Sequence, residues 1–166
     1  MKFNLTNFIE KSSIDDSIYF YLKEFKMISK ITVILLIMSS YLLSSIAIVK
    51  KTTGKVLVKR NKMEISIQAG SGLMVGDIVM TKSKSSAGII FDDGSRLSLG
   101  EKAIVVIREF KVKPSIKEYD VDLDLKKGKA VFSSGKIGKL APEALKFRIP
   151  EGIIGIRGTR FAVEVK

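Results

Sequence analysis

Two groups of closely spaced carboxylates could offer oxygen ligands to a cation. The first group lies in Asp92-Asp93-Gly94-Ser95. Carboxylates close to a glycine occur at the start of calcium-binding loops, but the later ligands of such a loop are missing here. A glycine between short polar residues is also typical of a turn. We therefore expect a turn at this position and no metal site.

The second group, Asp120, Asp122 and Asp124, alternates with apolar residues in the pattern of a half-buried strand. Side chains two positions apart share one face of a strand, so the three carboxylates could offer oxygen ligands to a cation. We expect instead a solvated face of charged residues, because several cations follow directly. These cations are Lys126, Lys127 and Lys129.

The residue types on which most catalytic sites depend are absent. The chain has no cysteine and no histidine, which excludes thiol nucleophiles, disulfides, zinc-thiolate sites and the usual general base. Residues 128–136 do not have the spacing of a phosphate-binding loop. Ser133 and Lys136 match the Ser-x-x-Lys pattern of some hydrolases, but no partner motif accompanies them. The sequence predicts no catalytic, cofactor-binding or metal-binding residue, and we expect no enzyme activity.

Arg157-Gly158-Thr159-Arg160-Phe161 is the densest polar cluster beside apolar residues. An arginine in such a position either bonds the carbonyl groups of a turn or contacts a ligand. We expect the structural role for Arg157. Together with residues 92–95, this cluster forms the candidate structural or interaction motif.

The chain is strongly basic, with 29 Lys and Arg residues against 17 Asp and Glu residues and a net charge of +12. Such an excess could neutralise the phosphates of a nucleic acid. The basic residues are dispersed, however, and aromatic residues make up only 8% of the chain. We expect a solvated, lysine-rich surface and no nucleic-acid partner. A surface of this kind outside a membrane would also attract anionic lipids or wall polymers.

The elements that must position these residues follow a long apolar run. Residues 31–49 contain no charged side chain, and as a helix they would span about 28 Å, close to the ~30 Å hydrocarbon core of a bilayer. We expect one N-terminal transmembrane anchor or signal peptide here, between a short segment of residues 1–30 and a domain of residues 50–166. The thirty preceding residues favour an uncleaved anchor with a short cytoplasmic segment. Translation from Met27 would instead give a signal peptide cleaved after Ala47, and both starts stay open.

The charges around the apolar run leave its orientation open. Three lysines shortly precede the run and six basic residues follow it within 13 positions. The positive-inside rule would place residues 50–166 in the cytoplasm, but that rule weakens when a long region is translocated.

Residues 50–166 consist of short β-type runs separated by turn residues, and all 13 glycines lie between Gly54 and Gly158. Runs at this spacing are typical of an all-β domain. The expected strands are 56–58, 63–67, 73–75, 78–80, 87–91, 96–99, 104–110, 121–125, 130–133, 146–149, 153–156 and 161–165.

Several of these runs carry motifs in an order that resembles the FecR-like periplasmic domain family. The resemblance covers about residues 52–166, and the matching stretches are 54–56, 72–79 with Thr81, 86–95 with Leu97 and Leu99, 125–128 and 150–163. It implies an extracytoplasmic, all-β domain of solenoid-like or sandwich-like form without catalysis. In sensor members of the family, such a domain relays a signal from an outer-membrane transporter to a cytoplasmic sigma factor.

The sensors also carry a cytoplasmic helical domain that holds the sigma factor and a C-terminal domain that meets the transporter. About thirty residues before the apolar run and three after residue 163 are too few for either domain. We therefore expect a stand-alone FecR domain protein.

The leading hypothesis is a non-enzymatic envelope protein whose FecR-like domain binds another envelope component, above all a protein. The domain would lie in the periplasm, anchored to the inner membrane through residues 31–49 or released by cleavage after Ala47. One alternative is signal relay across the membrane, with residues 1–30 as a cytoplasmic contact. Another alternative is a basic module that binds wall polymer or nucleic acid.

Overall fold

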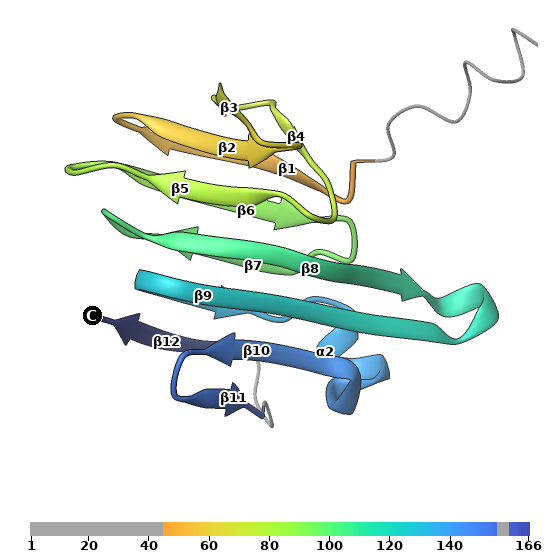
Figure 1. The fold of residues 1–166 in the computed structure, drawn as a ribbon. Helices are drawn as coiled ribbons and strands as arrows, with labels where there is room; N and C mark the ends of the chain where they lie inside the picture. Colours follow the sequence, from red (N-terminus) through yellow and green to blue (C-terminus); the bar gives the residue numbers. More distant parts are fainter. Residues whose placement is uncertain (1–44, 156–159) are drawn as a thin grey trace, which may run out of the picture. The chain divides into compact units, whose positions relative to one another are not determined.

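A computed structural model describes residues 45–155 and 160–166, which form strands with three short helical turns between them (Figure 1). The predicted all-β class is confirmed. The strands are β1 (Ala47–Thr53), β2 (Val56–Arg60), β3 (Met63–Ser66), β4 (Gly72–Leu73), β5 (Ile78–Thr81), β6 (Ser86–Phe91), β7 (Arg96–Leu99), β8 (Ile104–Lys113), β9 (Glu118–Ser133), β10 (Leu145–Ile149), β11 (Gly152–Ile154) and β12 (Arg160–Val165). The helical turns are η1 (Pro114–Ile116), α2 (Ile137–Leu140) and η2 (Pro142–Ala144).

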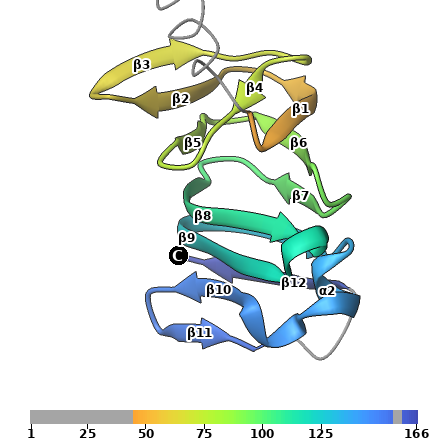
Figure 2. The ribbon, with the colours of Figure 1, turned by 90° about the vertical axis from the view of Figure 1, so that its right-hand side faces the viewer.

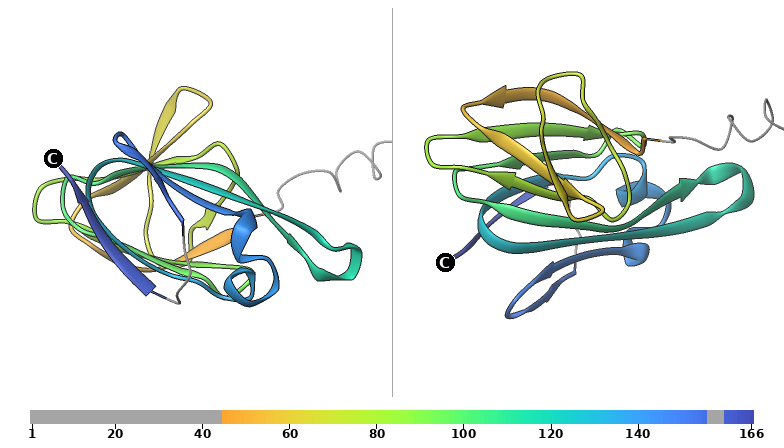
Figure 3. Two further views of the ribbon diagram at one scale, coloured as in Figure 1. Left: turned by 90° about the horizontal axis from the view of Figure 1, so that it is seen from below. Right: turned by 45° about the horizontal axis from the view of Figure 1, so that its top comes forward.

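The strands form one continuous sheet that curls on itself. Its order runs β3-β2-β5-β8-β9-β7-β6-β1-β4, with β10 and β12 also paired to β9 and β11 paired to β10. We call β4, β1, β6, β7, the second half of β9 and β12 the first arm. We call β3, β2, β5, β8, the first half of β9, β10 and β11 the second arm. Figure 3 shows the sheet curling round, and β9 is the element that joins the two arms.

This architecture differs in detail from the expected solenoid-like or sandwich-like form. A sandwich has two separate sheets, whereas here the sheet is continuous through β9. Among the described strands, every pair is antiparallel except β10 with β9. Alternation of buried and exposed residues, seen for example along β6 and β7, turns one face of each arm toward a single apolar core.

A bend at Gly128 allows β9 to serve both arms. Two separate strands were expected at 121–125 and 130–133, and the structure joins them into one strand of 16 residues. Gly128 has a φ of +88°, and a Cβ atom there would lie 2.5 Å from the Cα atom of Ala103. Only glycine combines this backbone conformation with such a close approach, so Gly128 fixes the point at which the sheet turns.

Buried polar side chains hold the ends of the strands in place. Asp77 is fully buried and accepts hydrogen bonds from Nε and Nη2 of Arg60, at 2.7 and 2.6 Å, and from the backbone N–H of Met74 at 2.8 Å. The hydrogen bond to Asp77 raises the pKa of Arg60 above its ordinary value. Thr81 joins two strand ends in a similar way, because its hydroxyl donates to Gly100 O at 2.6 Å and accepts from Ala103 N–H at 2.8 Å.

The first strand begins three residues before the expected domain boundary at residue 50. Ala47 and Val49 are fully buried in the core, and the N–H of Ile46 donates to Leu73 O at 2.8 Å. Residues 47–49 of the predicted apolar segment therefore belong to the sheet. Residues 1–30 and residues 31–44 of that segment lie outside the described residues. Within residues 45–155 and 160–166, no helix is long and apolar enough to cross a membrane.

Candidate functional site

The predicted turn at Asp92–Ser95, which we call the corner, connects β6 and β7 as an antiparallel hairpin. Gly94 takes a φ of +85°, which suits glycine. The carboxylate of Asp93 accepts the Ser95 N–H at 2.8 Å and the Ser95 hydroxyl at 2.8 Å. Asp93 and Ser95 are buried, whereas Asp92 and Gly94 are exposed. The prediction of a turn is therefore confirmed.

The corner also binds the chain that follows β9, about 40 residues later. Gly135 N–H donates to the Ser95 hydroxyl at 2.9 Å, and Ile137 N–H donates to the Asp93 carboxylate at 3.1 Å. A Cβ atom at Gly135 would lie 2.4 Å from Asp93 O and from Ser95 N. The Asp93 carboxylate thus accepts hydrogen bonds from three donors within the protein and fixes the start of α2.

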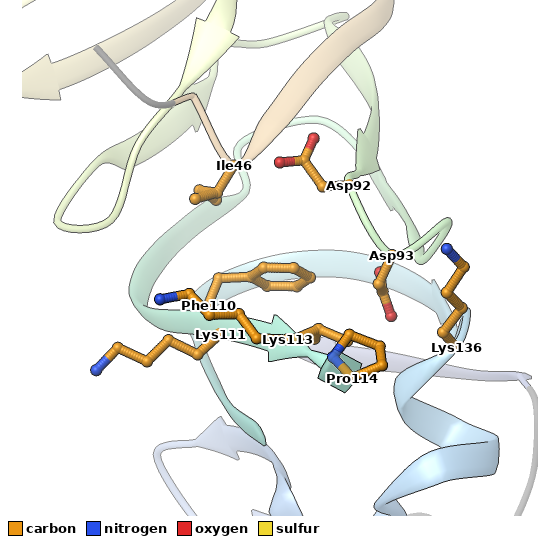
Figure 4. Close-up of a pocket in the computed structure, with 9 residues that line it drawn as sticks. Ile46, Asp92, Asp93, Phe110, Lys111, Lys113, Pro114 and Lys136 are labelled. Atoms are coloured by element: carbon orange, nitrogen blue, oxygen red, sulfur yellow. The ribbon is translucent and has the colours of Figure 1, made fainter. Parts of the chain in front are cut away.

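A cavity of about 190 Å³ lies beside the corner (Figure 4). In the ribbon, α2 lies at the same end of the strands as the turn that follows β8 (Figure 2). Phe110 contributes an apolar surface to this corner pocket, and its ring stacks on Phe91 with centroids 4.5 Å apart. Figure 4 shows carboxylate and lysine side chains on the segments around that ring. The residues that line the pocket are Ile46, Asp92, Asp93, Phe110, Lys111, Val112, Lys113, Pro114 and Lys136.

The lining of the corner pocket combines charged and apolar side chains. Its charged groups are carboxylates and ammonium groups, and it includes neither a hydroxyl nucleophile nor a general base held against one. Sites for small molecules are commonly about 300–1,000 Å³, and this pocket is smaller at about 190 Å³.

The second predicted cluster is only partly described. Arg157, Gly158 and Thr159 lie outside the described residues. Arg160 is exposed at the start of β12, and Phe161 is half-buried against the core. The Phe161 ring packs edge-on against Phe147 at 4.9 Å and tilted against Phe132 at 5.8 Å. Phe161 is therefore a packing residue, and Arg160 is the member of the described pair that faces solvent.

The sheet brings Arg160 close to the corner through Ser133. In the strand register, Arg160 lies opposite Ser133, and Ser133 lies opposite Arg96, the residue directly after the corner. Sequence reasoning missed Arg96 and Ser133 as site residues. Alternation along Arg96-Leu97-Ser98-Leu99 was a signal that Arg96 faces outward, but its neighbours across the sheet depend on a register that no local pattern reveals.

The row of Asp120, Asp122 and Asp124 is not the fully solvated face that the sequence predicted. Asp124 is buried and pairs with Arg108 at 2.5 Å and Lys126 at 2.8 Å. Asp122 accepts from Nε of Arg148 at 2.8 Å, across the parallel pairing of β9 with β10. The partners of Asp122 and Asp124 come from β8 and β10 as well as from the neighbouring lysine, because the strand register sets them side by side.

Burial and pairing act in opposite directions on the pKa of Asp124. Burial alone would raise the pKa, but the hydrogen bonds from Lys126 and Arg108 outweigh it and hold the pKa below its usual value. The hydrogen bond to Asp122 raises the pKa of Arg148. Among the residues that the structure describes, no group of three or more acidic side chains is arranged to hold a metal ion.

Comparison with known proteins agrees with these motifs. No curated protein and no solved structure matches the chain significantly. The family model described as FecR protein matches residues 77–166, more than half of the chain. The matched region begins at the buried Asp77 and includes the corner, Gly128, Gly135 and Arg160. The chain belongs to the FecR protein family.

Proposed function

We propose that this protein is a non-enzymatic binding protein of the bacterial envelope and that its FecR domain binds another protein at the corner. One observation carries the proposal. The polar groups of the corner that could do chemistry, Asp93 and Ser95, are bonded to the protein's own backbone. The corner instead offers a partner a small pocket that mixes apolar and charged side chains.

This composition supports a protein as the partner. Interfaces between proteins combine an apolar centre with a polar rim, and side chains of a partner fill small pockets. The corner pocket offers Phe110 and Ile46 as apolar contacts, with Asp92 and Lys136 as charged ones. A bound side chain with an aliphatic stem and a charged end would satisfy both kinds of contact.

Membrane attachment through the apolar segment is part of the proposal. Residues 31–49 carry no charge. Within this run, β1 of the sheet begins only at Ala47. Cleavage after Ala47 would remove a buried residue and the hydrogen bond from Ile46 to Leu73. These contacts favour an uncleaved anchor, and the FecR resemblance favours the periplasm for the domain.

A site-specific photo-crosslink in intact cells tests the proposal. A benzophenone amino acid replaces Asp92, which is exposed at the corner pocket. The matched control places it at Lys82, an exposed position in the turn between β5 and β6 at the opposite end of the strands (Figure 1). We expect a protein adduct from position 92 and none from position 82. Absence of an adduct at position 92, or equal adducts at both positions, would reject binding at the corner.

Signal relay across the membrane is the second candidate, and the family match favours it. In this hypothesis the FecR domain senses an envelope partner and residues 1–30 contact a sigma factor in the cytoplasm. Deletion of residues 3–22 tests it, because the FecR domain is left intact. Altered transcription of sigma-factor targets would support relay. Unchanged transcription, with the adduct at position 92 retained, would leave binding without relay.

A further inference from the structure

The outward face of the first arm carries a row of residues that crosses five strands. Register places Ile48 opposite Ile90, Ile90 opposite Arg96, Arg96 opposite Ser133 and Ser133 opposite Arg160. Adjacent strands are about 4.8 Å apart, so the row spans roughly 19 Å. One end of the row is apolar, and the other end consists of two arginines on either side of a serine.

A second row of smaller residues runs beside the first. Gly88, Ser98, Val131 and Ala162 are paired across β6, β7, β9 and β12 in the same register. The difference in size leaves a hollow of about 200 Å³, and its lining contains no carboxylate. The residues that line this hollow are Arg96, Ser98, Val131, Ser133 and Arg160.

The two arginines of the hollow differ from the other arginines of the described residues. Arg60, Arg108 and Arg148 each form an ion pair with an aspartate. Within residues 45–155 and 160–166, Arg96 and Arg160 form no ion pair, and both are exposed. The two arginines without an ion pair lie on either side of Ser133 in the strand register and line the same hollow. Guanidinium groups and a hydroxyl are donors suited to a carboxylate or another oxyanion.

We propose that this hollow binds a carboxylate group of a protein partner, with Arg96 and Arg160 donating from its two sides and Ser133 from its floor. The inference rests on the proposal that the domain binds a protein, because it names the chemistry of the partner's contact, but it places that contact outside the corner. The guanidinium fork matches a carboxylate in two parallel hydrogen bonds, which an ammonium group cannot reproduce.

The rest of the face favours an acidic protein segment over a phosphate polymer. A polyanion needs cations repeated along its path, whereas the row continues from Arg96 into Ile90 and Ile48. On the same face, Lys129 forms an ion pair with Glu164 at 3.2 Å, so a carboxylate already stands beside that cation. A segment that alternates acidic and aliphatic side chains would match both ends of the row.

Titration of the purified full chain in mild detergent tests the site. The probe is a blocked hexapeptide of alternating glutamate and valine, and the control peptide has glutamine in place of glutamate. The readout is the NMR signal of arginine Nε–H groups in the 15N-arginine-labelled chain. We expect the glutamate peptide, and not the glutamine peptide, to shift the signals of Arg96 and Arg160 while those of Arg60, Arg108 and Arg148 stay unchanged.

Two double variants distinguish the contribution of the guanidinium geometry to peptide affinity from the contribution of positive charge alone. Arg96→Lys with Arg160→Lys keeps the charge and loses the fork, and we expect peptide affinity to fall about 10-fold or more. Lys55→Ala with Lys82→Ala removes two exposed charges at the opposite end and should change affinity less than about twofold. Circular dichroism checks that both variants stay folded. An equal loss in the two double variants would overturn the proposal.

Inorganic polyphosphate, added at the same concentration of negative charge as the peptide, tests whether the hollow prefers a phosphate polymer to a carboxylate. Tighter binding of polyphosphate than of the glutamate peptide would overturn the proposal in favour of a wall-polymer contact.

The result of the peptide titration can also be distinguished from the result of the photo-crosslink. An adduct at position 92 without arginine shifts would reject the carboxylate site alone. Arginine shifts without an adduct would reject binding at the corner and retain the carboxylate site.

Discussion

Replacement of Asp93 by alanine should disrupt the turn at the corner and detach the segment that follows β9. The side chain accepts three hydrogen bonds, from Ser95 N–H, from the Ser95 hydroxyl and from Ile137 N–H. Hydrogen bonds to a charged acceptor contribute about 1.5–3 kcal/mol each, and neighbouring ones are not additive. Because two buried N–H groups would lose their partner, we expect Asp93→Ala to lower the free energy of unfolding by about 3–5 kcal/mol.

Thermal unfolding of the full chain in mild detergent, followed by far-UV circular dichroism, measures this loss. For a domain of this size, 1 kcal/mol corresponds to about 3–5 °C in Tm, so Asp93→Ala should lower Tm by about 10–20 °C. The matched control is Asp92→Ala, which removes the same charge from the same turn. Asp92 is exposed, and such changes cost about 0.5 kcal/mol or less.

Limited trypsin digestion adds a local readout to the same comparison. Lys136 lies next to the segment that the corner holds, and its own N–H donates to Asp93 O at 2.9 Å. At a temperature where both variants are folded, Asp93→Ala should be cut after Lys136 faster than Asp92→Ala. Equal Tm values and equal cutting in the two variants would refute the structural role of Asp93.

Three further predictions concern the bend at Gly128, the ion pairs of Asp124 and the start of β1. Gly128→Ala should cost about 2–4 kcal/mol in denaturant unfolding, whereas Gly76→Ala, with a φ of +89° and nothing within 4 Å of its Cβ position, should cost about 1 kcal/mol; similar losses would show that contact with Ala103 is unimportant. The pKa of Asp124 is lower in the folded chain, so its stabilisation is present above the unfolded pKa and is lost as pH falls through the folded pKa. The drop in Tm between pH 6 and pH 3 should therefore be smaller in Asp124→Asn than in the wild type, and an unchanged drop would contradict this ion-pair argument. Ala47→Asp should lower Tm sharply because Ala47 is fully buried, whereas Ile48→Asp, at a position 44% exposed, should lower it by only a few degrees; equal effects would argue against the start of β1 at Ala47.

Much of the fold could be predicted from local sequence patterns. Alternation from Asp120 to Leu125 predicted a half-buried strand, and the Asp-Gly-Ser turn predicted the corner; both are in the structure. These features depend on the two-residue period of strands and on the backbone freedom of glycine, which act over a few residues. The FecR motifs could also be found in the sequence because they are runs of neighbouring residues.

Other features were ambiguous or hidden until the chain was folded. The apolar run 31–49 has no internal mark to show where a lipid-facing segment would end and a buried strand begin, because lipid and protein core favour the same side chains. Nor does the pattern around Gly128 show that two predicted strands are one. That continuity depends on how closely β9 approaches Ala103.

The sequence by itself determined the β class of the domain, the turn at the corner, the absence of cysteine and histidine chemistry and the family. Tertiary structure alone decided which charged groups meet. It paired Asp124 with Arg108 and set Arg96 and Arg160 on either side of Ser133. The physical reason is that register between strands is a long-range property, fixed when the whole core packs and moved to the opposite face by a shift of one residue.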